Sequence, residues 1–514
     1  MTTVLDRTPA RGIALGATLV TIAVLALSLH RHGHSQGDDF ALYLRQAKSL
    51  FEGTTRDVVA DNRFSVRSSG GAFSPEVYPW GAPVLLAPFV KLWGLDYDRL
   101  KLIEVACFCG WLVLVHGVVR RRLGRPLAWA IVVVVGTAPV LLQHTDAILS
   151  EYPHALAVAG FIWWLDRVQL RGALIDAGAR DLVVLGLLAA LAYNVRRESI
   201  VLIVAIGLVQ VAELVPRLRD RWRRRDDAGA LPWLRIPIPH VSFVVAVAVF
   251  QLLLPSMLFP DNADSGPKHI PDRLAELPAL LTQMLGLEEQ HALGMVVVAL
   301  ALVGVVAGLV TRPRLDGALC LVALLSLLAV STHFRGTGPR YYFQILPWVL
   351  LFAATGVLAL VQVGAMIVAR GRTSGARRVG AALAIVALLV IAAVHVRPLS
   401  TRVAAVREVN ARGLQQVGPT HPDYVSIYGA VAEETPADAV ITFFRARTMT
   451  QLTDRRAIQT TNIDRAERSS DYYAQQKGSS YSQPDISELE GLSRGYVIVW
   501  SDQRWILWDL HPDD

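Results

Sequence analysis

The chain has 514 residues, 53% of them hydrophobic, and its mean hydropathy is +0.40. This composition is too apolar for a soluble enzyme of this size and indicates a polytopic membrane protein. The formal net charge is +7, but the basic residues gather in short arginine clusters, which are typical of membrane topology signals rather than of a nucleic-acid-binding surface. The three cysteines lie within hydrophobic stretches, so no disulfide framework is predicted.

Eleven hydrophobic stretches have roughly the length that a bilayer core requires and predict membrane spans. They are residues 12–30, 102–119, 127–143, 153–169, 181–195, 199–215, 239–258, 293–310, 316–333, 345–367 and 379–396. The first stretch lacks a small-residue cleavage site at its end, so we expect a retained anchor rather than a signal peptide.

Arginine clusters occur in alternate connecting segments, as the positive-inside rule requires of cytoplasmic loops. The clusters are Arg7 and Arg11, Arg120–Arg125, Arg167–Arg180, Arg217–Arg225, Arg312 and Arg314, and Arg370–Arg378. This pattern predicts a multi-pass plasma-membrane protein with a cytoplasmic N-terminus. An odd number of spans then places the C-terminus outside the cytoplasm.

The first outer loop, residues 31–101, is long and contains two apolar segments. Residues 37–53 predict a short amphipathic helix in the membrane interface, with Asp38 and Asp39 at its start and Gly53 at its end. The two acids are either simple helix caps or functional groups. Residues 78–94 contain three prolines and are short, so they predict an interfacial or re-entrant helix rather than a further span.

The later outer segments have a different character. A helix is expected at 273–285 within the outer loop 259–292. From residue 397 onward, helical patterns at 424–434, 447–453 and 485–491 alternate with strand-like runs at 439–444, 457–459 and 496–500. The sequence therefore predicts a membrane domain, 1–396, and a small extracytoplasmic α/β domain, 397–514, with a mobile loop at 475–484.

The predicted topology brings ionisable residues together on the outer face, where such residues usually mark function. They are Asp38, Asp39, Asp146, Glu151, Arg196, Arg197, Glu198, His333, Arg335 and Arg340. Transfer of a sugar from a lipid-linked phosphate needs this combination. A cation, from arginine or a divalent metal ion, stabilises the departing phosphate, and a carboxylate accepts the proton of the acceptor hydroxyl.

Five short motifs on this face carry a family resemblance. They are Gly37-Asp38-Asp39, Tyr78-Pro79-Trp80-Gly81-Ala82-Pro83, Leu149-Ser150-Glu151-Tyr152-Pro153, Val195-Arg196-Arg197-Glu198-Ser199 and Gly338-Pro339-Arg340-Tyr341. In this order they resemble the GT-C glycosyltransferases that use polyprenyl-phosphate sugars, a group that contains protein O-mannosyltransferases and bacterial aminoarabinose transferases. The resemblance implies a helical GT-C fold of about eleven spans with interfacial helices. It also implies inverting transfer to an acceptor hydroxyl in cell-envelope glycan, glycolipid or protein glycosylation.

The resemblance also implies roles for individual residues. Asp38 is expected as the base, with Asp39 orienting it or binding a divalent metal ion together with Glu151. Arg196, Arg197, Arg340 and Tyr341 are expected to bind the donor phosphate, and His333 and Arg335 are further outer-face candidates. The implied partners are a polyprenyl-phosphate-sugar donor, an envelope glycan, lipid or protein acceptor, and membrane lipids, with no nucleic acid.

Two other functions remain open. A transporter or flippase for a lipid-linked envelope precursor would use the same arginines, but predicts acids at the bilayer midplane and inverted repeats, neither of which is evident. A non-catalytic envelope-assembly scaffold would make Asp38 and Asp39 dispensable. A G-x-x-x-x-G-K nucleotide-binding motif is absent from the sequence, which argues against ATP-driven work.

Overall fold

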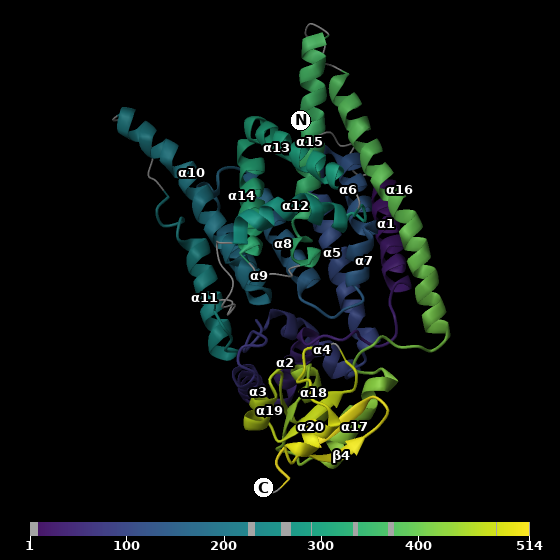
Figure 1. Ribbon diagram of the computed structural model, residues 1–514. Coiled ribbons are helices and arrows are strands. Elements are labelled where there is room, and N and C mark those ends of the chain that lie inside the picture. Colours follow the sequence, from purple (N-terminus) through teal and green to yellow (C-terminus); the bar gives the residue numbers. More distant parts are fainter. Residues whose placement is uncertain are drawn as a thin grey trace.

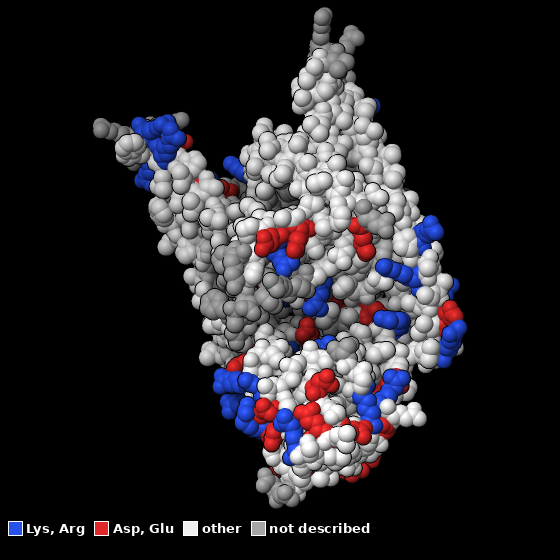
Figure 2. Space-filling model, viewed as in Figure 1, with Lys and Arg blue, Asp and Glu red and all other residues white. Residues whose placement is uncertain are grey.

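The computed structural model describes residues 9–224, 232–258, 269–288, 290–332, 338–368, 375–479 and 481–512. A large bundle of long helices lies above a smaller domain that contains a β-sheet, and short helices fill the region between them (Figure 1). Charged side chains gather on the smaller domain and along its junction with the bundle, whereas the visible bundle surface is mostly uncharged (Figure 2).

A helix lies at each of the eleven predicted spans, because long apolar runs satisfy their backbone groups internally as helices. The bundle helices are α1 (Pro9–Ser28), α5 (Tyr97–Leu123), α6 (Arg125–Thr137), α7 (Pro139–His144), α8 (Glu151–Gln169), α9 (Ala179–Val195), α10 (Ile200–Arg224), α11 (Ile238–Leu253), α13 (His291–Thr311), α14 (Pro313–Ser331), α15 (Leu346–Val368) and α16 (Ala376–Ala411). Helices α6 and α7 together occupy one predicted span and are separated by Ala138.

Among the described residues, six helices are long and apolar enough to cross a membrane, and four shorter helices are also apolar. The six are Tyr97–Leu123, Arg197–Arg223, His291–Thr311, Pro313–Ser331, Leu346–Ile367 and Ala376–Ala411. The multi-pass character is therefore confirmed, and the number eleven stays a prediction. The arginine-rich end of α10 lies at the opposite end of the molecule from the sheet (Figures 1 and 2), in keeping with the predicted topology.

Three short helices lie where the bundle meets the sheet domain: α2 (Asp39–Glu52), α3 (Thr55–Ser68) and α4 (Gly81–Trp93). The expected helix at 37–53 is confirmed, but it is buried on more than one side because it contacts both α4 and the sheet domain. Helix α4 has 13 residues, about 20 Å of helix, which is shorter than a hydrocarbon core. Helix α3 was not predicted, because its sequence is polar and its buried residues include Asn62 and Ser65.

The C-terminal region forms a mixed five-stranded sheet in the order β2-β1-β3-β5-β4. Its elements are α17 (Pro422–Glu434), β1 (Val440–Thr442), α18 (Ala446–Thr453), β2 (Arg456–Ile458), α19 (Ile463–Ser469), β3 (Tyr472–Gln476), α20 (Glu488–Ser493), β4 (Val497–Ser501) and β5 (Trp505–Asp509). Strand β1 pairs in parallel with β2 and β3, while β5 pairs antiparallel with β3 and β4. The predicted α/β character is confirmed. Residues 475 and 476 belong to β3, so the prediction that the mobile loop began at 475 was wrong.

Two further features complete the fold. Helix α12 (Ile270–Met284) matches the helix expected at 273–285 and contacts α13, α14 and α7. Helix α16 continues as one helix past residue 396 to Ala411, so the chain enters the sheet domain from a long rigid element. The division of the chain at 396 stays a prediction.

A buried arginine joins three bundle helices on the side away from the sheet domain. Arg122 of α5 donates to both carboxylate oxygens of Asp166 in α8, at 2.5 and 2.8 Å, and its Nε donates to Asp316 of α14 at 2.7 Å. All three side chains are almost completely buried. Charges buried in this way must be paired, because removal of one partner leaves another charge without compensation.

We therefore expect Arg122→Leu to lower the free energy of unfolding by about 3–5 kcal/mol, because it removes the closest cationic partner of two buried carboxylates and leaves them only Arg121 and Arg312. Denaturant titration of the detergent-solubilised protein measures this loss. Asp181→Asn is the matched control, since Asp181 pairs with the half-exposed Arg171 and should cost less than about 1 kcal/mol. Equal effects of the two substitutions would contradict the structural role of Arg122.

Candidate active site

The two acids at the start of α2 point to different surroundings. Asp38 occupies the N-cap position, yet its carboxylate makes no capping hydrogen bond to α2. Instead it accepts hydrogen bonds from the backbone N–H and the hydroxyl of Thr448, at 3.3 and 3.4 Å. A simple cap therefore does not account for Asp38, which ties the helix start to the sheet domain. Burial raises the pKa of Asp38 against the opposing charges of Arg447 and Arg445.

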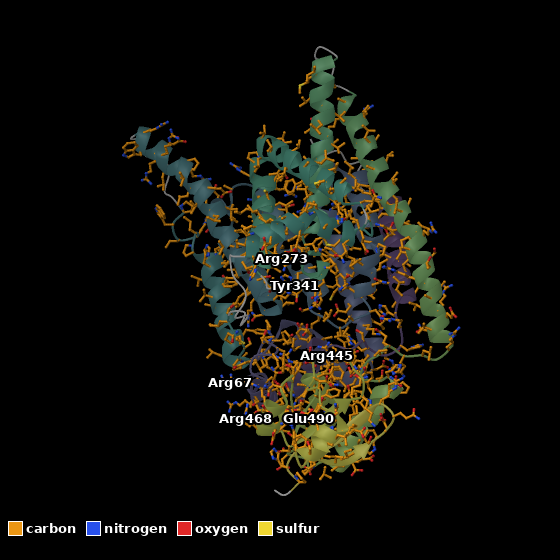
Figure 3. All side chains as sticks on the ribbon, viewed as in Figure 1. Arg67, Arg273, Tyr341, Arg445, Arg468 and Glu490 are labelled. Atoms are coloured by element: carbon orange, nitrogen blue, oxygen red, sulfur yellow. The ribbon has the colours of Figure 1, made fainter. Side chains whose placement is uncertain are left out.

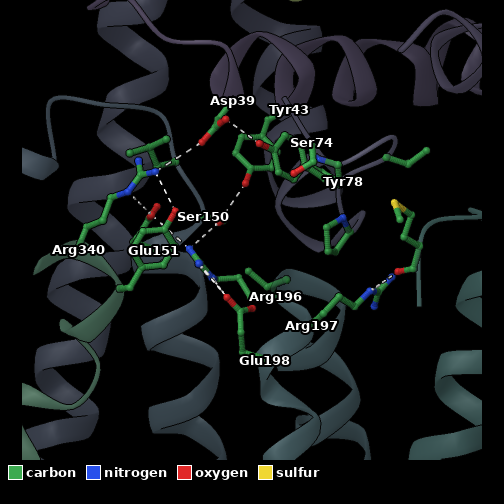
Figure 4. Close-up of a pocket in the computed structure, with 17 residues that line it drawn as sticks. Asp39, Tyr43, Ser74, Tyr78, Ser150, Glu151, Arg196, Arg197, Glu198 and Arg340 are labelled. Atoms are coloured by element: carbon green, nitrogen blue, oxygen red, sulfur yellow. Dashed lines mark hydrogen bonds and ion pairs between the residues drawn. The ribbon is translucent and has the colours of Figure 1, made fainter. Parts of the chain in front are cut away.

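Asp39, in the first turn of α2, is the more accessible acid. Its side chain is 37% exposed, and one oxygen accepts a 2.6 Å hydrogen bond from the Tyr78 hydroxyl. Guanidinium nitrogens of Arg340 and Arg447 lie 3.8 Å from its two oxygens. Asp39 is thus an oriented carboxylate that lines a cavity, with Tyr78 and Arg340 close to it (Figure 4).

Glu151 lies opposite, at the first position of α8, where the positive end of the helix dipole favours a carboxylate. Its Oε1 pairs with Arg196 at 3.2 Å and with Arg340 at 3.5 Å. Its Oε2 is buried and has no hydrogen-bond partner among the residues that the structure describes. Arg196 also pairs with Glu198 at 2.9 Å. Although burial disfavours the charged guanidinium, Glu198 and Glu151 raise the pKa of Arg196 well above its ordinary value.

These groups line a cavity of about 310 Å³, which we call the first cavity (Figure 4). Its walls come from the start of α2, the segment before α4, the start of α8, the turn after α9 and the turn η5 (Pro339–Tyr342). The sequence-predicted residues that line it are Asp39, Glu151, Arg196, Arg197, Glu198, Arg340 and Tyr341. The Arg196 and Arg340 guanidinium groups both lie close to the ring of Tyr341, at 4.8 and 4.9 Å from its centre.

Arg197 lines the first cavity, but its nitrogen atoms are directed to the protein. Its Nε donates to the Met257 carbonyl at 2.8 Å, and its other nitrogens donate to Tyr193, Asn194 and Ser256. This geometry favours a role in holding residues 256–257 against the end of α9. Binding of donor phosphate by Arg197 stays a prediction.

Other expected residues lie elsewhere. Asp146 Oδ1 forms an ion pair with Nζ of the buried Lys101, at 2.8 Å. Asp146 does not line the first cavity. His333 and Arg335 fall outside the described residues. Arg7, Arg225, Arg370 and Arg372 of the predicted arginine clusters are also outside them.

The sheet domain supplies a residue that sequence reasoning missed. Arg447 of α18 donates to Asn62 of α3 at 2.9 Å, to the Pro75 carbonyl at 2.7 Å and to the Tyr78 hydroxyl at 3.2 Å. These bonds fix the position of the Tyr78 hydroxyl, which in turn donates a hydrogen bond to Asp39. No sequence signal near residue 447 points to this role, because the contact spans 369 residues of chain.

The sequence predicts that Asp39 and Glu151 bind a divalent metal ion. Within the described part of the chain, no three His, Cys, Asp or Glu side chains come together in a group that could hold a metal ion. Arg340 contacts both Asp39 and Glu151, so a divalent ion held by these two acids would compete with its guanidinium.

Comparison with known proteins places this arrangement within a known fold. No protein-family model matches the sequence, and no curated protein is similar to it in sequence. Among solved structures, ArnT from Cupriavidus metallidurans bound to undecaprenyl phosphate is similar over 99% of each chain, with 14% identity and a TM-score of 0.55. The Archaeoglobus fulgidus oligosaccharyltransferase AglB, in complex with an inhibitory peptide and a dolichol-phosphate, is similar over 91% of this chain and 70% of its own, with 12% identity and a TM-score of 0.52.

The chain has the GT-C fold. Both solved structures are GT-C glycosyltransferases, so the expected fold class is confirmed. At these identities the similarity extends to the fold and not to individual site residues. The roles of its side chains therefore depend on the geometry of this protein alone.

The link between Arg447 and the Tyr78 segment is testable in the isolated protein. We expect Arg447→Gln to increase the amide hydrogen exchange of residues 72–78 by about tenfold or more, because charge-assisted hydrogen bonds to this segment are lost. Exchange followed by mass spectrometry measures the change.

The matched control is Arg456→Gln. Arg456 also joins the sheet domain to α3, through Asp61 at 3.0 Å, but its side chain is 53% exposed. Its loss should leave exchange in residues 72–78 unchanged. An equal increase in both variants would show that Arg447 has no special role in ordering this segment.

Proposed function

We propose that the protein is an integral membrane inverting glycosyltransferase that moves a sugar from a polyprenyl-monophosphate donor to an acceptor hydroxyl on the outer face of the membrane. One observation carries the proposal. The oriented carboxylate of Asp39 and the guanidinium groups of Arg196 and Arg340 line the same cavity, on the side of the bundle that meets the sheet domain. This is the base and phosphate-binding pair that the reaction needs.

The donor phosphate would lie between Arg196 and Arg340. Guanidinium groups bind phosphate oxygens through paired, charge-assisted hydrogen bonds, and both arginines are fixed by Glu151. Tyr341, whose ring is close to both guanidinium groups, would limit the positions that the phosphate can take. The binding of undecaprenyl phosphate by ArnT and of dolichol-phosphate by AglB supports a polyprenyl carrier.

In the proposed step, the acceptor oxygen attacks the anomeric carbon and forms the new glycosidic bond. The bond from that carbon to the phosphate oxygen breaks, and its electron pair leaves with polyprenyl monophosphate. The hydroxyl proton passes to Asp39. Arg196 and Arg340 stabilise the additional negative charge on the leaving phosphate. One displacement on the face opposite the phosphate inverts the configuration of the sugar.

The base assignment differs from the sequence-based expectation. Asp39 lines the first cavity and is held by Tyr78, whereas Asp38 is buried against Thr448. We therefore propose that Asp39 is the base. Asp38 is a neighbouring carboxylate that does not take this role.

The requirement for a divalent metal ion is a separate proposal. If it is required, Glu151 and Asp39 are its nearest carboxylate ligands, and Arg340 must move to admit it. Chelator followed by readdition of Mg²⁺, Mn²⁺ or Zn²⁺ tests this requirement directly.

The proposed topology has a cytoplasmic N-terminus and an extracytoplasmic sheet domain in the plasma membrane. It is supported by the position of the arginine-rich end of α10, opposite the sheet domain. In this orientation the site faces the periplasm or cell wall, where envelope glycans, glycolipids and proteins are modified.

The role of Asp39 predicts the outcome of a transfer assay. With a panel of polyprenyl-phosphate hexoses and pentoses, Asp39→Asn should lower sugar transfer and the slower hydrolysis of the donor by about 10²–10⁴-fold, because no base accepts the attacking proton. Asp57→Asn, an exposed acid in the first turn of α3, is the control and should match wild type.

Comparison with Asp38→Asn assigns the base. A larger loss in Asp38→Asn than in Asp39→Asn would restore the sequence-based assignment. A folded wild-type protein that binds the donor and never cleaves it would favour the transporter or scaffold.

The phosphate site predicts a binding result that does not depend on turnover. We expect Arg196→Gln and Arg340→Gln each to weaken binding of undecaprenyl phosphate by about 10–100-fold, since each removes a charge-assisted hydrogen bond. Binding is measured on protein in nanodiscs. Arg217→Gln, which alters a partly exposed pair with Asp176 outside the site, is the control. Unchanged affinity in both site variants would contradict the proposed phosphate position.

A further inference from the structure

A second cavity of about 380 Å³ adjoins the first cavity on the side of the sheet domain. Asp39, Ser74, Leu149 and Arg340 line both cavities and form the boundary between them. The remaining walls come from the chain before α2, from residues 72–73 and from the sheet domain. The proposed base therefore faces two spaces, only one of which contains Arg196 and Glu151.

Four residues that line the second cavity carry buried polar atoms that have no hydrogen-bond partner in the described part of the chain. These atoms are Gln36 Nε2 and Oε1, Asp38 Oδ2, Arg445 Nε and Gln459 Oε1. The Asp38 residue is more than nine-tenths buried, and its other oxygen already pairs with Thr448. Leaving a buried polar atom unpaired costs free energy, so such atoms indicate a missing partner.

The chemistry of these atoms is mixed. Asp38 Oδ2 and Gln459 Oε1 accept hydrogen bonds, whereas Arg445 donates them. Figure 3 shows Arg445 and Tyr341 near the junction, from the sheet domain and the bundle respectively. A ligand that fits must present both donors and acceptors over a short distance.

Neighbouring hydroxyl groups have this property, because each hydroxyl both donates and accepts. Phe40 and Phe73 also line the cavity and contribute apolar surface to it. The volume lies within the usual range of small-molecule sites. Two carboxylates and three arginines line the cavity, and this mixture of charges suits a neutral ligand with several hydroxyl groups better than a group that carries charge of one sign.

We propose that the second cavity binds the acceptor and that the acceptor is a polyhydroxylated sugar unit of a glycan or glycolipid. Asp38, Arg445 and Gln459 hold its hydroxyl groups, and one further hydroxyl reaches Asp39 at the boundary with the first cavity. This inference rests on the proposed glycosyltransferase function and names its acceptor class. It also gives the sheet domain a direct role, since Arg445 and Gln459 both belong to it.

The test uses the full-length protein in nanodiscs with polyprenyl-phosphate hexose and pentose donors. The acceptor probes are methyl glycosides of common hexoses and pentoses, compared with peptides that contain serine and threonine. Two products are measured, the glycosylated probe and the free sugar released by water. The variants are Arg445→Gln and Gln459→Met, with Arg468→Gln, an exposed arginine of α19, as the matched control.

We expect wild type to glycosylate at least one methyl glycoside and no peptide. Arg445→Gln should raise the KM for the glycoside by about 10–100-fold, as expected for a lost charge-assisted hydrogen bond, and shift the partition of donor from glycoside towards water. Gln459→Met should act in the same direction. Arg468→Gln should match wild type in both KM and partition.

The outcomes separate this inference from the function on which it rests. A wild-type protein that cleaves no donor contradicts the glycosyltransferase function. A protein that hydrolyses the donor but glycosylates only peptides, or no probe, overturns the acceptor class and leaves the glycosyltransferase function intact. Unchanged KM and partition in Arg445→Gln and Gln459→Met would also overturn the proposed acceptor site. A melting temperature equal to wild type verifies that each variant is folded.

Discussion

The pairing of Glu151 with Arg196 and Arg340 is the interaction on which the site depends. Three chain turns that are far apart in sequence meet here: the start of α8, the turn after α9 and the turn η5. Two guanidinium groups near an apolar bundle cannot remain close together without a carboxylate to offset their repulsion. Glu151 supplies this carboxylate and, through Arg340, connects the arginines to Asp39. The same pairing fixes the arginines in advance, so little reorganisation is needed when phosphate enters.

The sheet domain completes the site. Thr448 binds Asp38, and Arg447 binds the segment that carries Tyr78, so α18 determines how the start of α2 is held. Since Tyr78 donates to Asp39, the orientation of the proposed base depends on a residue of the C-terminal domain. A domain that looks separable in sequence is thus part of the proposed catalytic site. Its position over the site also accounts for the second cavity, which exists only where the two domains meet.

Much of the fold and of the site could be predicted from the sequence. The bilayer determines both how long a hydrophobic span must be and on which side arginine clusters lie. A helix lies at each predicted span, and the motifs around Asp39, Glu151, Arg196 and Arg340 converge on one cavity. The different surroundings of Asp38 and Asp39 could not be predicted. Adjacent residues at a helix start point about 100° apart, and which one faces the cavity depends on the domain that covers the helix.

Other features were missed for related reasons. Helix α3 is polar and gains its order from contacts with β2 and α18. Strands β3 and β5 lie inside the sheet and are largely buried on both faces, so they lack the alternating pattern that identifies a strand at a surface. The sequence around Arg447 matches no motif, and Arg447 contacts Tyr78 only in the folded chain.

The most direct measurement is an experimental structure of the protein with a non-cleavable polyprenyl-phosphonate sugar. We expect the phosphonate oxygens to lie within hydrogen-bond distance of Arg196 and Arg340. We also expect the anomeric carbon to face Asp39 across the boundary between the two cavities. A phosphonate held elsewhere, or a sugar turned away from Asp39, would contradict the proposed site.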